Sequence, residues 1–372
     1  MNKTILFIKR EAVLCISGVL AIFSCFLVPP SKDYLKYINL HVLILLFCLM
    51  LVVAGIRKTG AFTVVCEALL RKFNSMKAVG LLLVLLSFFM SMLLTNDVTL
   101  VTIVPFTLLI FEKIQNDKKP LAIIILLVLE TIGANLGSML TPMGNPQNLY
   151  LYTEYNLSLG EFIEMVLPYS ALSLVLLIVS VFVFIPSMKT EAPSDTTQIN
   201  GKLKLVLYCV LFAVNMLTVA KIMDAKILLA VIVIAMIILD RKLFANVDYS
   251  LLLTFVFFFV FVGNIGNITA ISDKIESVLH GREIAVAVAS SQVISNVPAA
   301  ILLSELTDNA KSLLIGINLG GLGTLIASMA SLITYKYYAK SEGSKPHKYI
   351  LIFTLMSVSY LVILLAFNAV IS

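Results

Sequence analysis

Hydrophobic residues run along this chain in long blocks that short polar stretches separate. A helix rises roughly 1.5 Å per residue and the hydrocarbon core of a bilayer is about 30 Å thick, so an apolar run of about 17 residues predicts a membrane-spanning helix. Apolar segments fall at about 12 to 28, 40 to 56, 78 to 94, 98 to 111, 121 to 140, 165 to 185, 205 to 220, 226 to 239, 249 to 264, 284 to 303, 312 to 335 and 349 to 370. The pattern predicts an all-α polytopic membrane protein.

Composition supports this class, because 60% of the residues are hydrophobic and only 13% are charged. Such a chain is too apolar for a soluble domain. The formal net charge of +6 therefore bears on topology, and we expect a lipid membrane and no nucleic acid as a partner. The first apolar run ends at Val28 without a small-x-small cleavage pattern, which favours an uncleaved first helix over a signal peptide.

Two polar interruptions resemble each other. Thr95-Asn96-Asp97 breaks the apolar run from 78 to 111, and Ser295-Asn296-Val297-Pro298 breaks the run from 284 to 303. Each is followed by a second break, at 141–148 and 320–328. Asn135-Leu136-Gly137 and Thr141 align without a gap on Asn318-Leu319-Gly320 and Thr324, which indicates a duplicated chain.

The distribution of Lys and Arg predicts the topology. If 78–111 and 284–303 are re-entrant hairpins, 20 of the 27 basic residues fall on the side of the N-terminus, which the positive-inside rule places in the cytoplasm. About nine spans and two hairpins result. We expect a first repeat at 1–185 with its hairpin at 78–111, a cytoplasmic loop and linker helix at 186–225, and an inverted second repeat at 226–372 with its hairpin around 284–306.

Broken membrane helices leave backbone N–H and C=O groups that protein, water or substrate must satisfy. Helix N-termini at such breaks attract anions, while carbonyl, Asn and Ser oxygens suit Na⁺. Asn96 and Asn296 are candidate Na⁺ ligands. The candidate substrate and ion site as a whole is Thr95, Asn96, Asp97, Thr141, Gly144, Asn145, Asn148, Ser295, Asn296, Thr324 and Ser328. The alternative for the small residues is that they only allow close helix packing.

Asp97 and Glu130 are the acids that lie deep inside apolar runs, where ionisable groups indicate function. Asp97 could carry a coupling proton or bind Na⁺, or act as the N-cap of the helix that starts at Val98. Glu130 could simply bond a neighbouring helix. We expect no cofactor other than Na⁺ or H⁺ as the coupling ion. In a chain without Trp, we interpret five tyrosines as anchors at the membrane interface: Tyr150, Tyr152, Tyr335, Tyr337 and Tyr338.

At these residues the chain resembles the ion transporter superfamily: divalent anion/sodium symporters, citrate-type carriers, and arsenite efflux permeases with related sodium/proton antiporters. The Ser-Asn-Thr tips of the dicarboxylate symporters are similar to Thr95-Asn96-Asp97 and Ser295-Asn296-Val297. The resemblance implies that Asn96 and Asn296 contribute to sodium sites and contact substrate, with Thr95, Ser295, Asn145 and Thr324 nearby. Asp97 and Val297 depart from the Thr of that motif, and Asn96-Asp97 followed by Pro105 is closer to the arsenite permease pattern, which suggests proton coupling.

We therefore expect a secondary active transporter that moves a small anion, a carboxylate or an inorganic oxyanion, with Na⁺ or H⁺ by alternating access. The alternative is a Na⁺/H⁺ antiporter without an organic substrate. An enzyme is not expected, because an intramembrane aspartyl protease needs two buried aspartates and Asp97 is the single candidate. The expected location is the plasma membrane of a prokaryote, and the resemblance suggests a homodimer.

Overall fold

The computed structural model describes residues 11–32, 34–70, 73, 75–112, 119–187, 198–268 and 277–371. Regular structure within these ranges is helical, and seven helices are long and apolar enough to span a membrane. Their bounds are α4 Leu40–Lys58, α6 Met76–Leu94, α8 Lys119–Ser138, α10 Leu159–Phe184, α11 Lys202–Val219, α13 Tyr249–Gly266 and α19 Pro346–Ile371. The prediction of an all-α polytopic membrane protein is confirmed.

Shorter helices complete the described chain. They are α2 Ala12–Leu27, α3 Tyr34–Tyr37, α5 Ala61–Leu70, α7 Asn96–Glu112, η1 Pro142–Gly144, α9 Pro146–Glu154, α12 Ala225–Asp240, η2 Arg241–Asn246, α15 Glu283–Ile294, α16 Asn296–Ser304, α17 Ala310–Gly320 and α18 Met329–Lys340. The α10 helix begins six residues earlier than its apolar segment, because Ser158 and Glu161 form a capping box at its start. Residues 188–197 of the predicted loop lie outside the described residues.

Both predicted hairpin tips are breaks of one residue with nearly the same backbone geometry. Thr95, between α6 and α7, has φ 75° and ψ 148°, and Ser295, between α15 and α16, has φ 74° and ψ 153°. This region is unfavourable for a side chain with a Cβ atom, so the surrounding packing must hold both residues there. The α6 and α7 helices both pack on α8, and α15 and α16 both pack on α17.

Glycines allow this packing at equivalent positions of the two repeats. A Cβ atom on Gly137 of α8 would lie 2.1 Å from the carbonyl oxygen of Phe88 on α6. A Cβ atom on Gly320 of α17 would lie 2.5 Å from the Oγ of Ser291 on α15. Gly320 therefore allows α17 to pack closely on α15.

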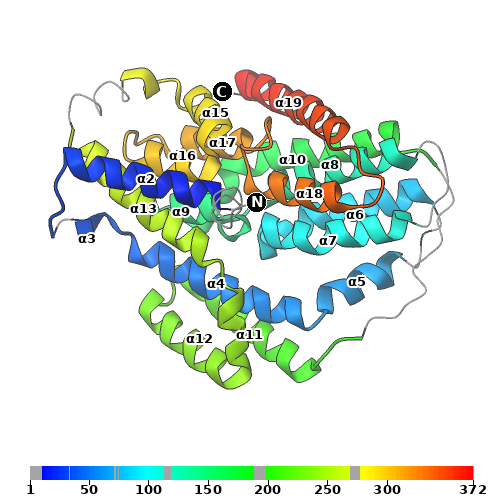
Figure 1. Ribbon diagram of the computed structural model, residues 1–372, viewed down its shortest axis with the longest axis horizontal. Helices are drawn as coiled ribbons and strands as arrows, with labels where there is room; N and C mark the ends of the chain where they lie inside the picture. Colours follow the sequence, from blue (N-terminus) through cyan, green and yellow to red (C-terminus); the bar gives the residue numbers. More distant parts are fainter. Residues whose placement is uncertain are drawn as a thin grey trace, which may run out of the picture.

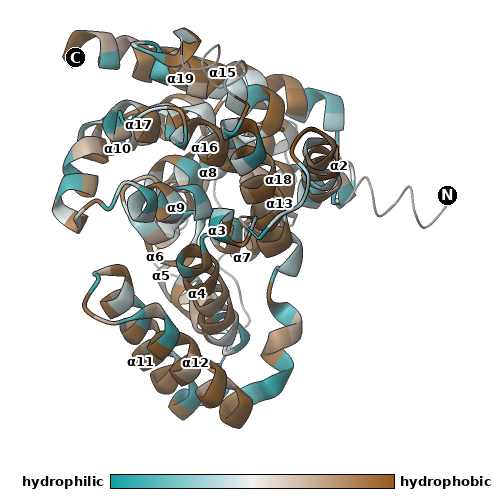
Figure 2. Cartoon of the chain, turned by 90° about the vertical axis from the view of Figure 1, so that its left-hand side faces the viewer, coloured by the Kyte–Doolittle hydropathy of each residue, from teal (hydrophilic) through white to brown (hydrophobic). Residues whose placement is uncertain are grey.

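The remaining helices exchange partners between the repeats. The α2 helix packs on α13, and in the same way α12 packs on α4. The α11 helix contacts α4 and α12, and these helices lie together at the lower side of the molecule in Figure 1. Hydrophobic residues cover much of the outer helix surfaces, as Figure 2 shows for α11 and α12, which fits a lipid environment.

Candidate functional site

The tip of the first hairpin bonds to Asn135 on α8, which also bonds the helix break of the second repeat. The amide nitrogen Nδ2 of Asn96 donates to Oδ1 of Asn135 on α8 at 3.0 Å. The same Asn135 oxygen accepts from the hydroxyl of Ser328, at the start of α18, also at 3.0 Å. Asn96 accepts in turn from the backbone N–H of Asp97 at 2.9 Å. Asn135 therefore joins a hairpin tip of one repeat to the helix break of the other.

The second break forms a matching contact. Asn145 is the N-cap of α9, accepting from the backbone N–H of Asn148 at 2.8 Å, and its Nδ2 donates to Oδ1 of Asn318 on α17 at 3.5 Å. Asn318 donates to Oδ1 of Asn148 at 2.7 Å. Asn135 and Asn318 occupy aligned positions, as do Asn145 and Ser328. The contact of Asn135 with Ser328 and the contact of Asn318 with Asn145 are therefore equivalent: in each, the Asn of one repeat bonds the helix break of the other.

Asn296 is held differently. Its backbone N–H donates to the carbonyl of Ala327 at 3.0 Å, and the Ser295 hydroxyl donates to the same carbonyl at 3.4 Å. Its Nδ2 lies 2.9 Å from the place where a Cβ atom on Gly321 would stand, so only glycine fits that position without a shift. Among the described residues, no hydrogen bond links Asn96 directly to Asn296.

A cavity of about 440 Å³ lies between the two hairpin tips. Polar and charged side chains in its lining come from both repeats: Glu11, Arg57, Asp97, Asp248, Ser250, Thr254, Ser295 and Lys336. Oδ1 of Asp97 is buried and has no hydrogen-bond partner among the described residues. The N-cap alternative for Asp97 is wrong, because α7 starts at Asn96 and the hydroxyl of Thr95 accepts the N–H of Val98.

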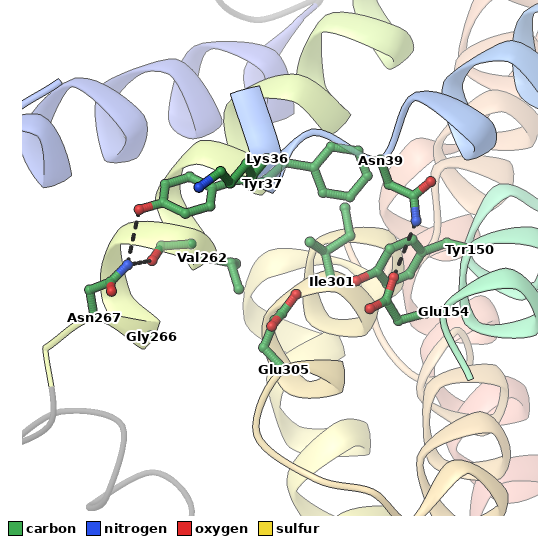
Figure 3. A pocket seen from close by; sticks show the side chains of 12 residues that line it. Lys36, Tyr37, Asn39, Tyr150, Glu154, Val262, Gly266, Asn267, Ile301 and Glu305 are labelled. Atoms are coloured by element: carbon green, nitrogen blue, oxygen red, sulfur yellow. Dashed lines mark hydrogen bonds between the residues drawn. The ribbon is translucent and has the colours of Figure 1, made fainter. Parts of the chain in front are cut away.

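A second cavity, of about 500 Å³, lies at the opposite ends of α4 and α13 (Figure 3). Its lining includes Asn39, Tyr150, Glu154 and Glu305, and the amide of Asn39 donates to Glu154 at 3.2 Å. Burial, and then repulsion from Glu154, raises the pKa of the Glu305 carboxyl. The start of α16 lines the first cavity and its end lines the second.

Aromatic rings separate the two cavities. The ring of Tyr150 on α9 lies 6.4 Å from that of Phe255 and 5.7 Å from that of Phe259, both on α13. The Tyr150 hydroxyl shares a hydrogen bond of 2.8 Å with Ser304 of α16. The prediction that Tyr150 and Tyr152 are interfacial anchors is wrong, because their side chains are 1% and 2% exposed inside the protein.

Other predicted site residues form contacts within the framework. The hydroxyl of Thr141 donates to the carbonyl of Met92, and that of Thr324 donates to the carbonyl of Gln292 at 3.5 Å, which are equivalent contacts below the two tips. A Cβ atom on Gly144 would lie 2.1 Å from the carbonyl oxygen of Ser138. These residues shape the breaks and do not line the cavity between the tips.

Sequence reasoning missed several polar residues of this region. In the sequence, Asn135 and Asn318 indicate the alignment of the repeats, but they are not among the predicted site residues. An amide that recurs at matched positions beside a helix break is a signal that could have identified them. Arg57, Asp248 and Lys336 line the cavity, whereas their positions near segment ends indicated topology alone. Proximity to the tips is a property of the tertiary structure.

Two repeats with broken helices that meet around buried amides, in an apolar all-helical chain, define a polytopic membrane transport protein. A family model described as citrate transporter matches residues 2–313. The chain therefore belongs to the citrate transporter family, and the predicted relation to citrate-type carriers is confirmed.

Similar proteins support the same class. An uncharacterized transporter of Methanocaldococcus jannaschii, MJ0456, is 34% identical over 336 residues, which cover 87% of each chain. The inner membrane protein YbiR of Escherichia coli is 29% identical over 315 residues, covering 84% of this chain and 83% of YbiR. The silicon efflux transporter LSI3 of rice is 31% identical over 161 residues, covering 43% of this chain and 32% of LSI3.

Proposed function

We propose that this protein is a secondary active transporter of a small anion, a carboxylate or an inorganic oxyanion, and that the cavity between the hairpin tips receives the substrate. The observation that carries the proposal is the placement of Arg57 and Lys336 in this cavity together with the start of α7 at one tip and the start of α16 at the other, beside the acids Glu11, Asp97 and Asp248. Cationic side chains and helix N-termini both favour an anion.

Two cavities at opposite ends of α4 and α13 fit alternating access. The nine residues of α16 extend over roughly 13 Å at 1.5 Å per residue. Because its start lines one cavity and its end lines the other, the two cavities are separated by about the length of this short helix. The rings of Tyr150, Phe255 and Phe259 close the path between them. Movement of the hairpins relative to α4 and α13 would open one cavity and close the other.

Asn96 and Asn296 are proposed to bind the coupling Na⁺ and to contact substrate together with Thr95 and Ser295. Asn145, Asn148 and Ser328 support them by linking the broken helices of the two repeats. H⁺ is the other coupling ion that the site suits, because Asp97 brings to the cavity between the tips a carboxyl whose Oδ1 has no hydrogen-bond partner in the part of the chain that the structure describes.

The same feature of Asp97 favours a second function, a Na⁺/H⁺ antiporter without an organic substrate. A buried carboxyl at the cavity, such as that of Asp97, can bind H⁺ or Na⁺ in turn. Asp97→Asn distinguishes the two functions. In the antiporter this variant abolishes the response of pH to a Na⁺ gradient, whereas in the anion transporter it changes the pH dependence of anion uptake.

The distribution of basic residues supports a cytoplasmic N-terminus in the plasma membrane of a prokaryote, with the cavity beside Arg57 and Lys336 open to the cytoplasm. A homodimer is proposed from the superfamily resemblance. Labelling of single cysteines introduced next to Lys36 and Lys242 tests the orientation, because the two positions lie on opposite sides in this topology.

The decisive experiment uses purified protein in liposomes that contain a pH-sensitive dye. A Na⁺ gradient is imposed alone, and then with citrate, succinate, sulfate or arsenite. Uptake of one of these anions supports the proposal, and a pH change with Na⁺ alone supports antiport. Full activity of both Asn96→Ala and Asn296→Ala would contradict the assignment of the tips. Lys336→Gln should weaken anion uptake, while Lys242→Gln, an exposed lysine outside the cavity, serves as its matched control.

A further inference from the structure

A second buried carboxyl lies away from the cavity between the tips. Glu130, on α8, is 0% exposed, and its Oε1 accepts a hydrogen bond of 2.7 Å from the hydroxyl of Thr107 on α7. Its other oxygen, Oε2, is buried and has no hydrogen-bond partner among the described residues. The expectation that Glu130 bonds a neighbouring helix is confirmed for Oε1. That bond does not explain why the second oxygen, Oε2, is buried without a partner among the described residues.

Buried hydroxyl groups of α18 and α19 contact Thr131, the residue next to this carboxyl. Thr131, the next residue on α8, donates to the hydroxyl of Thr334 on α18 at 2.8 Å. Tyr349 of α19 is 0% exposed and faces Thr131 and Glu130, and its hydroxyl forms no hydrogen bond of normal distance and angle with another described residue. Two fully buried polar groups with unused atoms therefore lie close together, which is uncommon in a folded protein.

A cavity leads toward this cluster from the protein surface. Its volume is about 680 Å³, and it extends from the turn after α18, at Lys340 and Gly343, to Pro105 and Tyr338. Pro105 lies two residues before Thr107 on α7. The ring of Tyr338 stacks on that of Tyr349 with centroids 5.1 Å apart. The ring of Tyr338 in the cavity wall thus contacts Tyr349, which in turn faces Glu130.

The charges around Glu130 decide which ligand it can take. No charged side chain of α6, α7, α8, α10 or α18 faces Glu130 among the described residues, and the titratable groups nearby are the tyrosines Tyr349 and, behind it, Tyr338. A buried carboxylate without a counter-charge is costly, so the carboxyl is stable as the neutral acid. The described residues contain no group of three acidic, His or Cys side chains that could hold a metal ion, so one carboxyl among hydroxyls fits a proton.

We propose that Glu130 is a proton-binding site distinct from the cavity between the hairpin tips, which exchanges its proton through the cavity beside Pro105 and Tyr338. The carboxylate takes up one proton and becomes the neutral acid, and it returns the proton by the same route. For its part in transport the inference depends on the proposed function. The binding of the proton itself does not.

Thr107 connects this site to the first hairpin. Pro105 lacks the N–H that would bond the carbonyl of Val101, so α7 is weakened one turn before Thr107. An ionised Glu130 would hold the Thr107 hydroxyl more strongly than the neutral acid does, because hydrogen bonds to charged acceptors are stronger. Gain or loss of the proton therefore changes how firmly the arm of the hairpin is held on α8.

Infrared spectroscopy of the purified full-length protein in lipid tests the site without any transport assay. A carboxylic acid C=O band present at neutral pH should disappear in Glu130→Gln and remain in Glu164→Gln, a control with an exposed carboxyl. In the wild type the band should weaken as the pH is raised and shift in D₂O. A band that does not respond to pH or D₂O would mean a permanent structural acid and would overturn the proposal, as would a band unchanged in Glu130→Gln.

A second variant keeps the test open if Glu130→Gln does not fold. Thr107→Val removes the donor and retains the shape, so the band should shift in frequency; an unshifted band would overturn the assignment to Glu130. In liposomes, Glu130→Gln should retain substrate-dependent uptake but lose part of its pH dependence. The infrared result stands even if no anion is transported, so failure of this inference and failure of the proposed function are distinguishable.

Discussion

Replacement of Gly137 by alanine should destabilise the first hairpin. The added Cβ atom would lie 2.1 Å from the carbonyl oxygen of Phe88. This distance is 0.9 Å shorter than 3.0 Å, the closest approach that Cβ atoms normally make. The obstacle is backbone of α6, so no side-chain rotation relieves the clash and the two helices must separate. Overpacking of this kind costs about 1–3 kcal/mol.

Gly320→Ala tests the equivalent position of the second repeat. There the nearest atom is the Oγ of Ser291, at 2.5 Å, which belongs to a side chain that can move. We expect a smaller loss than for Gly137→Ala. Gly160→Ala is the matched control, because nothing lies within 4 Å of the new Cβ atom and the substitution raises helix propensity by about 0.5–1 kcal/mol.

Thermal unfolding of the three purified variants in detergent measures the effect. The chain contains no Trp, so far-UV circular dichroism is the suitable signal. The expected order of midpoints is Gly160→Ala at or above wild type, then Gly320→Ala, then Gly137→Ala. A Gly137→Ala midpoint equal to that of wild type would refute the close approach of α6 to α8 and with it the position of the tip at Thr95.

Three further predictions concern the site. Asn135→Ala removes the acceptor shared by both of its partners and should lower transport by more than tenfold with a small change in thermal midpoint, measured by uptake in liposomes and by circular dichroism. Phe255→Ala removes a ring from the barrier between the cavities and should let ions leak, which a fluorescent dye in liposomes detects. Glu305→Gln should raise the thermal midpoint at neutral pH, because the pKa of this carboxyl is raised in the folded protein. The folded state therefore loses stability as the pH rises from the pKa of the unfolded chain, roughly 4.3, through the higher pKa of the folded state. The gain should vanish below that range, while Glu164→Gln, an exposed carboxyl, should leave the midpoint unchanged at every pH.

Each of these predictions has an outcome that would contradict it. Normal transport by Asn135→Ala would mean that its two hydrogen bonds do not support the tips. Tight liposomes with Phe255→Ala would place the barrier elsewhere. A gain for Glu305→Gln that is the same at all pH values would arise from altered packing and not from ionisation.

The class of this protein and the positions of its helix breaks could be predicted from the amino-acid sequence. Long apolar runs must form helices in lipid, because no water is present there to satisfy exposed backbone groups. The Thr95-Asn96 and Ser295-Asn296 interruptions were therefore visible without a structure, and both became breaks with φ near 75°. The matched Asn135 and Asn318 likewise indicated the duplication.

Which polar groups meet could not be predicted from the sequence, because it depends on how the helices pack. Asn135 bonds Asn96 and Ser328, which are distant in sequence, and Arg57 and Lys336 join the lining of one cavity from two repeats. The aromatic side chain of Tyr150 suits a membrane interface and a barrier between cavities equally well, so local sequence could not distinguish them. Local pattern fixes helices because their bonds are local, whereas a site between repeats depends on which helix faces pack together.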